Sequence, residues 1–143
     1  MFYYIKTTKK NGFYSIKSPS FSNIQGTGNN FDEALIDFWD KLYKEINMIF
    51  QNYSNIPVYT EGKPNCDNKR SHDGVIQITP NVLLKIKLYE LLKENGIRPN
   101  ELTDKITSNV NKLLDSRHHS TVWEFEEAFL ELGYNLNVSV KPR

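Results

Sequence analysis

Cysteine is nearly absent from this sequence of 143 residues, which contains only Cys66. A single thiol excludes an intramolecular disulfide framework and suits a reducing compartment. Long apolar runs are absent as well. No stretch approaches the roughly 20 residues of a membrane span, and the opening MFYYIKTTKK has no apolar segment of signal-peptide length. We therefore expect a cytoplasmic protein with no membrane partner.

An excess of either charge is also missing. The sequence has 18 Lys and Arg against 17 Asp and Glu, a formal net charge of +1, so it has no overall attraction to nucleic acid or membranes. It does contain enough apolar material for a core, with 38% hydrophobic and 13% aromatic residues, which excludes a disordered chain. At this length the chain can form one domain or two small ones.

Three strand-like segments open the chain. Residues 2–8 and 12–18 are rich in β-branched and aromatic residues. Asn11-Gly12 between them favours a type I′ hairpin turn, which needs a positive φ at both positions. Residues 21–28 predict a third short strand.

A long amphipathic helix follows these strands. Asn30 can cap its N-terminus, and Glu33 can reach back as in a capping box. Apolar residues then recur at helical spacing and form one broad stripe. Residues 51–73 predict an irregular connection and residues 74–79 another strand. Residues 1–79 therefore predict a β-β-β-α-β domain, with one sheet packed on one helix.

Residues 80–143 predict a helical domain with a C-terminal strand, so the fold class is α+β. The helices are delimited by capping residues, by proline at a first helical position and by glycine at the ends. The predicted elements are a helix from Pro80 to Gly96, very short helices at 100–106 and 109–116, a helix capped by Thr121 and Glu124 and ended by Gly133, and a strand at 134–141.

Clustered acids on the long helix raise the possibility of a metal-dependent nuclease. Such an enzyme also needs carboxylates on its strands, and the strand segments 2–8, 12–18 and 74–79 contain no Asp or Glu. The helix acids lie opposite the apolar stripe or in the first turn, where the helix dipole favours them. We expect no catalytic residue, metal or other cofactor, with an RNase H-like nuclease as the alternative. The four acids are Asp32, Glu33, Asp37 and Asp40.

The other metal-ligating residues do not form a known pattern. Cys66, His72 and Asp73 match no zinc spacing, and a fourth ligand is not evident. His118 and His119 are adjacent and point in different directions on a helix. A polar surface is the simpler interpretation of both groups.

Two short helices joined by a tight turn form a helix-turn-helix pattern. Asn residues on its second helix could bind adenine edges, and Lys could reach guanine or phosphate. Residues 80–143 are nevertheless neutral, with nine Lys and Arg against nine acids, whereas a typical DNA reader is basic. The alternative is a small helical bundle that does not touch DNA. The predicted DNA-binding residues are Lys105, Ser108, Asn109, Asn111, Lys112, Arg117, His118 and His119.

The order of these segments resembles the HicB family of antitoxins over nearly the whole chain. GFYSIKSPSF resembles the family's second strand and following loop, and IQGTGNNFDEALIDFWDKL resembles its glycine-containing entry to the long helix. VIQITPNVLLKIKLYELLKENGI resembles its last sheet strand and first C-terminal helix. NELTDKI, VNKLLDSRHHST and FEEAFLELGYNLNVSVKP resemble the helix-turn-helix and terminal strand of its longer members.

This resemblance implies a partial RNase H-like domain that keeps the sheet and helix without the catalytic acids. It implies that this domain binds a HicA-type toxin, a small RNA-cleaving protein, and covers its active histidine and RNA surface. It also implies that the C-terminal domain binds operator DNA as a dimer. We expect an antitoxin that neutralises an mRNA interferase and represses its own operon, and not an enzyme. A helix-turn-helix regulator without a toxin partner is the alternative.

Two protein-binding surfaces are predicted. Toxin contact is expected around the loop SPSFSNI, because exposed aromatic residues commonly anchor interfaces; alternatively, Phe21 closes the core under the helix. The terminal strand has unpaired backbone groups that a second copy could satisfy, although it could also pair within its own domain. The predicted toxin-binding residues are Tyr14, Phe21 and Ser22, and the predicted dimerisation residues are Leu136, Val138 and Val140.

One departure from the family concerns the turn before the second short helix. Between Ile106 and RHHST, helix-turn-helix members carry a few more residues than TSNVNKLLDS, and Thr107-Ser108 replaces the usual small or glycine residue. Base readout depends on the N-terminal end of this helix. The shortening therefore predicts that dimerisation could persist without operator binding.

Overall fold

A computed structural model describes residues 1–60 and 73–140, and the chain divides into two compact units, Met1–Pro80 and Asn81–Arg143. Cys66 and His72 lie outside the described residues. None of the described helices is long and apolar enough to span a membrane.

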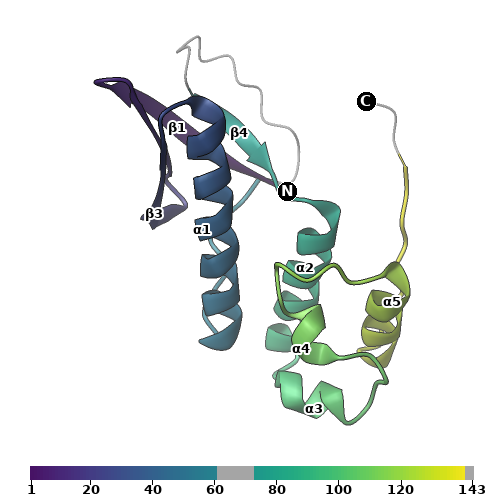
Figure 1. Ribbon diagram of the computed structural model, residues 1–143. Helices are drawn as coiled ribbons and strands as arrows, with labels where there is room; N and C mark the ends of the chain where they lie inside the picture. Colours follow the sequence, from purple (N-terminus) through teal and green to yellow (C-terminus); the bar gives the residue numbers. More distant parts are fainter. Residues whose placement is uncertain (61–72, 141–143) are drawn as a thin grey trace. The chain divides into compact units, whose positions relative to one another are not determined.

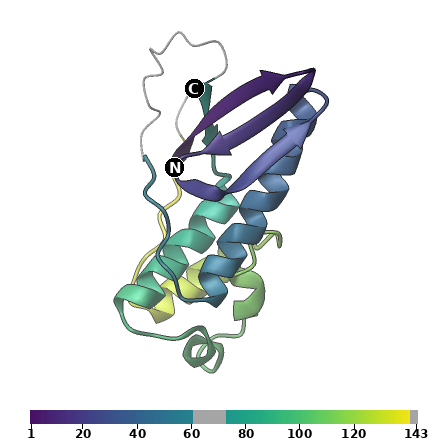
Figure 2. The same cartoon turned by 90° about the vertical axis from the view of Figure 1, so that its left-hand side faces the viewer.

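The first unit is an antiparallel sheet with one long helix on one face (Figures 1 and 2). The strands run in the order β3-β2-β1-β4. β1 pairs with β2 through its second half and with β4 through its first half. The predicted α+β class and β-β-β-α-β succession are confirmed. The elements are β1 (Phe2–Lys10), β2 (Phe13–Ser18), β3 (Phe21–Gly28), α1 (Phe31–Gln51) and β4 (Asp73–Gln77).

The hairpin turn between β1 and β2 has the predicted conformation. Asn11 has φ 51° and Gly12 has φ 82°, so both central residues have the positive φ of a type I′ turn. Lys10 and Phe13 pair directly beside it.

Two glycines let β3 approach α1 closely. A Cβ atom added at Gly26 would lie 2.5 Å from the Phe38 Cβ, and one at Gly28 would lie 2.5 Å from the Ala34 nitrogen. Atoms at such separations overlap, so a side chain at either position would push the helix away. The glycine-containing segment before α1 therefore sets the distance between the helix and the sheet.

The start of α1 is capped almost as predicted. The Asn30 side chain accepts a hydrogen bond from the Glu33 backbone N–H at 2.9 Å. The Glu33 carboxylate reaches back to the backbone N–H of Asn29, also at 2.9 Å, rather than to that of the cap residue. The Asn29 side chain donates to the same carboxylate oxygen, so the reciprocal bond is displaced by one residue.

The second unit contains four helices around a small apolar core. The capping box of Thr121 and Glu124 is present at the start of the last helix, and Gly96 and Gly133 have the positive φ of helix-ending glycines. The helices are α2 (Pro80–Glu94), α3 (Pro99–Thr103), α4 (Val110–Leu113) and α5 (Val122–Glu131). The core consists of Leu88, Leu92, Leu102, Val110, Leu113, Phe125, Ala128 and Phe129.

Four predicted elements differ from those in the structure. The two short helices are shorter than the predicted 100–106 and 109–116, so that α4 is a single turn. Residues 134–140 form no strand, because an alternating sequence needs a neighbouring strand and the described part of the second unit contains none. β4 begins at Asp73, so one carboxylate does belong to a strand, contrary to the sequence-based expectation.

Candidate functional site

The turn between α3 and α4 is held by one carboxylate from α5. Glu127 accepts hydrogen bonds from the backbone N–H groups of Thr107 and Ser108, at 2.6 and 3.0 Å. It also accepts bonds from both hydroxyl groups. These bonds, led by that of the Ser108 hydroxyl, lower the pKa of Glu127 to about 2. The turn between α3 and α4 is thus fastened by a carboxylate that stays charged at neutral pH.

The N-terminus of α4 is capped by a predicted DNA-binding residue. The Asn109 side-chain oxygen accepts the backbone N–H of Lys112 at 3.2 Å. This oxygen is therefore engaged within the protein, as expected for an N-cap asparagine. Asn111 and Lys112 are exposed on the same turn, and they are better placed to meet an outside partner.

The C-terminal end of α4 is held by a buried lysine from α2. The Lys85 side chain is fully buried, and its Nζ donates to the carbonyl oxygens of Lys112 and Leu113, at 2.8 and 3.3 Å. It also donates to the Ser120 hydroxyl at 2.8 Å and lies 5.3 Å from the centre of the Phe125 ring. A cation is favoured at the carbonyl end of a helix.

Burial changes the acidity of this lysine. Removal from water lowers the pKa of Lys85 to about 8, although the charges of Asp115 and Glu124 act in the opposite direction. The sequence analysis missed Lys85. A signal was present, because this lysine lies in α2 next to the buried Ile86 and three residues after the buried Val82.

The loop that follows α4 is tied to α2 by an asparagine. The Asn81 side chain donates to the Ser120 carbonyl at 2.5 Å and accepts from the Ser120 backbone N–H at 3.4 Å. The α4 turn is thus positioned from α2 and α5 through Lys85, Asn81 and Glu127.

The predicted DNA-binding residues all lie between the end of α3 and the start of α5. Several of them have internal partners besides the cap residue, among them Arg117, whose backbone N–H donates to the Asp115 side chain at 3.0 Å. Lys105 forms an ion pair of 3.7 Å with Glu131, and Ser108 donates to Glu127. Arg117 and His119 are exposed, whereas His118 is half-buried. The segment thus combines groups that hold the turn with the exposed side chains of Asn111, Lys112 and His119.

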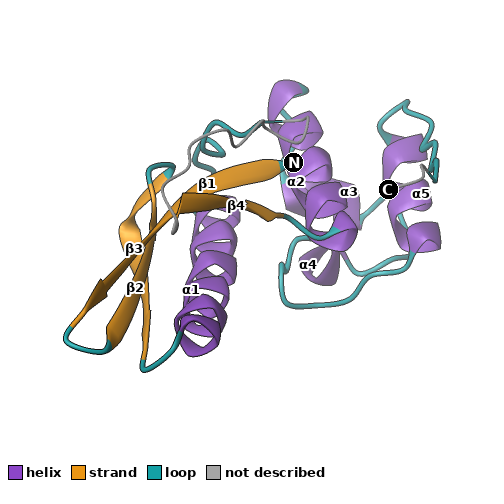
Figure 3. Ribbon diagram, turned by 90° about the horizontal axis from the view of Figure 1, so that it is seen from above, coloured by secondary structure: helices purple, strands orange, loops and turns teal. Residues whose placement is uncertain are grey.

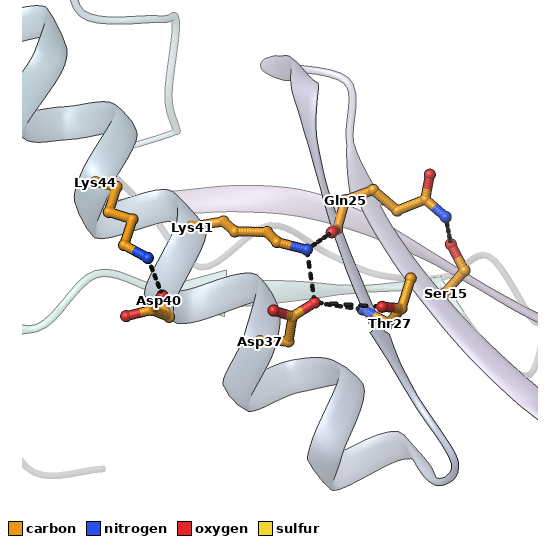
Figure 4. Close-up of polar contacts among 7 residues, drawn as sticks. All are labelled: Ser15, Gln25, Thr27, Asp37, Asp40, Lys41 and Lys44. Carbon is orange, nitrogen blue, oxygen red and sulfur yellow. Dashed lines mark hydrogen bonds and ion pairs between the residues drawn. The ribbon is translucent and has the colours of Figure 1, made fainter.

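One acid of α1, Asp37, fastens the helix to the sheet, whereas Asp40 pairs within the helix (Figure 4). Asp37 accepts from the Thr27 backbone N–H and from Lys41 Nζ, each at 2.8 Å. Lys41 also donates to the Gln25 carbonyl at 2.7 Å. The hydrogen bond from Lys41 is the main cause that lowers the pKa of Asp37, despite partial desolvation. Asp40 pairs with Lys44 at 2.8 Å.

These acids therefore do not converge on a common point. Within residues 1–60 and 73–140, no three His, Cys, Asp or Glu side chains are grouped to hold a metal ion. Asp73 begins β4, but its side chain lies outside the described part of the chain. The clustering of acids on α1 first suggested a nuclease, but Glu33, Asp37 and Asp40 bond to neighbouring groups of the protein instead.

The expected exposure of Phe21 is wrong. Phe21 is 2% exposed, and its ring packs edge-on against Tyr3 with ring centres 4.8 Å apart. It closes the core, as in the alternative interpretation. Ser22 is exposed, and Tyr14 is half-buried with Lys9 Nζ 5.1 Å from its ring centre.

The three predicted dimerisation residues have different environments. Leu136 packs against the core of the second unit, whereas Val138 is 66% exposed and Val140 is 96% exposed. The described segment after α5 therefore leaves two apolar side chains in water.

The fold defines a two-unit α+β protein whose candidate sites are surfaces of each unit. Over 142 residues the chain is 22% identical to a protein named Antitoxin HicB from Pseudomonas fluorescens (strain Pf0-1), a match that covers 97% of this chain and 93% of that relative. The predicted resemblance to the HicB antitoxins is therefore confirmed.

No family model matches the chain. The crystal structure of the N-terminal domain of the Burkholderia pseudomallei antitoxin HicB has a TM-score of 0.45 and 12% sequence identity to this chain, and the match covers 55% of this chain and 99% of that domain.

Proposed function

We propose that the protein is a cytoplasmic antitoxin that neutralises a HicA-type mRNA interferase through its first unit and represses its own operon through its second. The observation that carries this proposal is the similarity to a HicB antitoxin across 97% of the chain, because that match extends over both units. The first unit would be the partial RNase H-like domain implied by the resemblance, and it would have no hydrolytic activity.

Toxin binding is assigned to exposed residues of the first unit near the β2–β3 connection. Tyr14 and Ser22 remain candidates, whereas the buried Phe21 would act only by supporting the loop from below. The test is co-expression with the product of a small basic reading frame adjacent to this gene, scoring growth and co-purification. Ser22→Arg should weaken rescue, and Gln51→Arg, the same charge change at the exposed end of α1, should not. Failure of the wild-type chain to rescue growth would refute the proposal.

Operator binding is assigned to the α4 segment. A homodimer would place two such segments about one DNA turn apart on an inverted repeat. Asn111 and Lys112 would face the major groove, together with Asn109 if its cap opens. The phosphates would be met by Lys105, Arg117, His118 and His119, with Ser108 at the turn.

A gel-shift titration of the region upstream of the operon tests this assignment. Asn111→Ala should weaken binding by about 1–3 kcal/mol and relax specificity at one base pair. Asn95→Ala, at the exposed residue that follows α2, should leave the shift unchanged. Binding to unrelated DNA should be weak because the second unit is neutral. No shift at micromolar protein in low salt would leave the second unit as a dimerisation module.

Dimerisation is assigned to the segment after α5. Residues 134–140 have no strand partner within the described chain. Their backbone groups could pair with those of a second copy across a two-fold axis. Truncation after Tyr134 should convert a dimer to a monomer in light scattering. An unchanged dimer would refute the assignment of Leu136, Val138 and Val140.

A further inference from the structure

The sheet face opposite α1 carries exposed aromatic residues. Figure 3 shows α1 against one face of the sheet, and no other described helix belongs to this unit. On the opposite face Tyr4 is 49% exposed and Phe13 is 61% exposed. Tyr4 lies on β1 and Phe13 on β2, the two central strands of the sheet. Burial of apolar surface does not explain these two rings, because one lies within β1 and the other beside the hairpin turn, and both remain exposed to water.

The same face is basic. Lys6 and Lys17 are directly opposite each other in the β1–β2 register, and Lys10 is opposite Phe13. All three lysines are exposed. Like charges placed directly opposite on neighbouring strands destabilise a sheet, so this arrangement does not serve folding. In the backbone register Lys6 pairs with Asp73, the first residue of the edge strand β4.

Short polar side chains occupy the row between the lysines and Phe13. Thr8 is opposite Ser15. Thr27 of β3 follows in the register, but its hydroxyl group donates to Asp37 of α1 at 3.4 Å, so Thr8 and Ser15 form the hydroxyl row of this face. The Gln25 side chain donates to the Ser15 hydroxyl at 2.5 Å. From the row of Tyr4 to the row of Phe13 the face extends for about 20 Å along the strands, enough for a few nucleotides of an extended strand.

We infer that this face binds single-stranded nucleic acid. Lys6, Lys10 and Lys17 would contact phosphates, Tyr4 and Phe13 would stack on unpaired bases, and the hydroxyl row would lie between them. Exposed rings on the central strands of a sheet, flanked by cations, are the arrangement that binds single strands with little sequence preference. A duplex would hide its base faces from the rings, and a second copy of this face would bring lysines against lysines.

Fluorescence anisotropy with the full-length protein tests this inference. The probes are labelled oligouridylate, oligothymidylate of equal length and a duplex of unrelated sequence. The wild type should bind both single strands more tightly than the duplex. Equal affinity for RNA and DNA would mean that the 2′-hydroxyl is not read, and a preference for RNA would place that group against the hydroxyl row. Both results support the face as a single-strand site.

Two sets of variants separate this face from the rest of the chain. Tyr4→Ala with Phe13→Ala should weaken binding at least about fivefold for each stacked base that is released, and Tyr4→Phe with Phe13→Tyr should retain it. Lys6→Glu with Lys17→Glu should also reduce the salt dependence, by about 0.7 in log–log slope for each phosphate that is no longer neutralised. Lys44→Glu with Lys93→Glu makes the same charge change on α1 and α2 and should have little effect.

Several outcomes would overturn the inference. One is the absence of binding at micromolar protein in low salt, and another is unchanged binding in the double alanine variant. Loss of single-strand binding in Lys112→Glu would assign it to the second unit. Equal competition by polyglutamate of matched charge would indicate an unspecific anion surface. The inference is independent of toxin and operator binding, because none of these measurements contains a toxin or an operator.

Discussion

The buried lysine under α4 predicts an unusual dependence of stability on pH. In the unfolded chain Lys85 keeps its proton up to the ordinary pKa of 10.5, whereas in the folded protein its pKa is about 8. Between these values the unfolded state binds more protons, so the free energy of unfolding rises with pH. Below about pH 8 both states are protonated and this contribution has no slope.

The magnitude follows from the two pKa values. Their difference corresponds to a gain of about 3 kcal/mol in the free energy of unfolding as the pH rises from 8 to 10.5. Lys85→Met fills the same space without a titratable group and should remove this gain. It should also leave the carbonyl oxygens of Lys112 and Leu113 without their donor, so α4 should fray. Lys87→Met is the control, because Lys87 is on the same helix with its side chain 39% exposed.

Urea unfolding at several pH values measures this effect. In a Trp39→Phe background, Trp123 in α5 reports the second unit alone, because the sequence has two tryptophans. Tyrosine titration affects the Lys85→Met and Lys87→Met proteins equally and cancels in their difference. The reasoning would be refuted if the free energy of unfolding of Lys85→Met rose with pH as much as that of the wild type. It would also be refuted if Lys87→Met lost this rise.

Three other predictions follow from contacts in each unit. Glu127→Gln should lower the stability of the second unit at neutral pH. In the wild type the free energy of unfolding should fall as the pH drops from about 4.5 to about 2, the pKa of Glu127 in the folded protein. Urea titrations of Glu127→Gln should not show this fall in stability. Gly26→Ala should lower the free energy of unfolding by about 1–3 kcal/mol, the usual cost of overpacking. Thermal melts measure this loss, with Gly74→Ala as the control. Gly74→Ala should be tolerated, because the nearest atom to its added Cβ is 3.9 Å away. Replacing the four α1 acids by Asn and Gln should leave toxin rescue largely intact, and metal-dependent RNA cleavage that disappears in that variant would contradict the antitoxin assignment.

Local signals in the sequence predicted local structure well. Asn11-Gly12 specifies a turn through backbone conformation alone, and Thr121 with Glu124 specifies a helix start through bonds within one turn. Such features depend on residues a few positions apart. These features can therefore be predicted without knowledge of the rest of the fold.

Features that depend on distant partners could not be predicted in the same way. Lys85 and Glu127 are ordinary helix residues in the sequence, and their roles arise only because the α4 segment folds between them. In the sequence Phe21 resembles an exposed aromatic residue of a loop, and only the fold shows that it packs against Tyr3. Residues 134–141 have the alternation of a strand, but alternation does not supply the neighbour that a strand requires.

The candidate site shows the same division. The segment between α3 and α5 was identified as a candidate from the resemblance to the HicB family, which also predicts a shortened turn there. The sequence did not indicate that Asn109 would be used as a cap or that Lys105 would pair with Glu131. Side-chain bonds of this kind depend on distances between elements, which periodicity does not encode.

The pairing of β1 has a consequence for the order of folding. Residues 6–10 of β1 pair with β2, which is nearby in sequence, whereas Phe2 pairs with Gln77 at the far end of the unit. Closing the longer loop costs more chain entropy, so the hairpin, β3 and α1 should associate before β4 does. During synthesis the first half of β1 would have to wait for β4 to leave the ribosome. An incomplete chain would therefore expose an unpaired strand edge, which makes the unfinished unit the stage most vulnerable to aggregation and proteolysis.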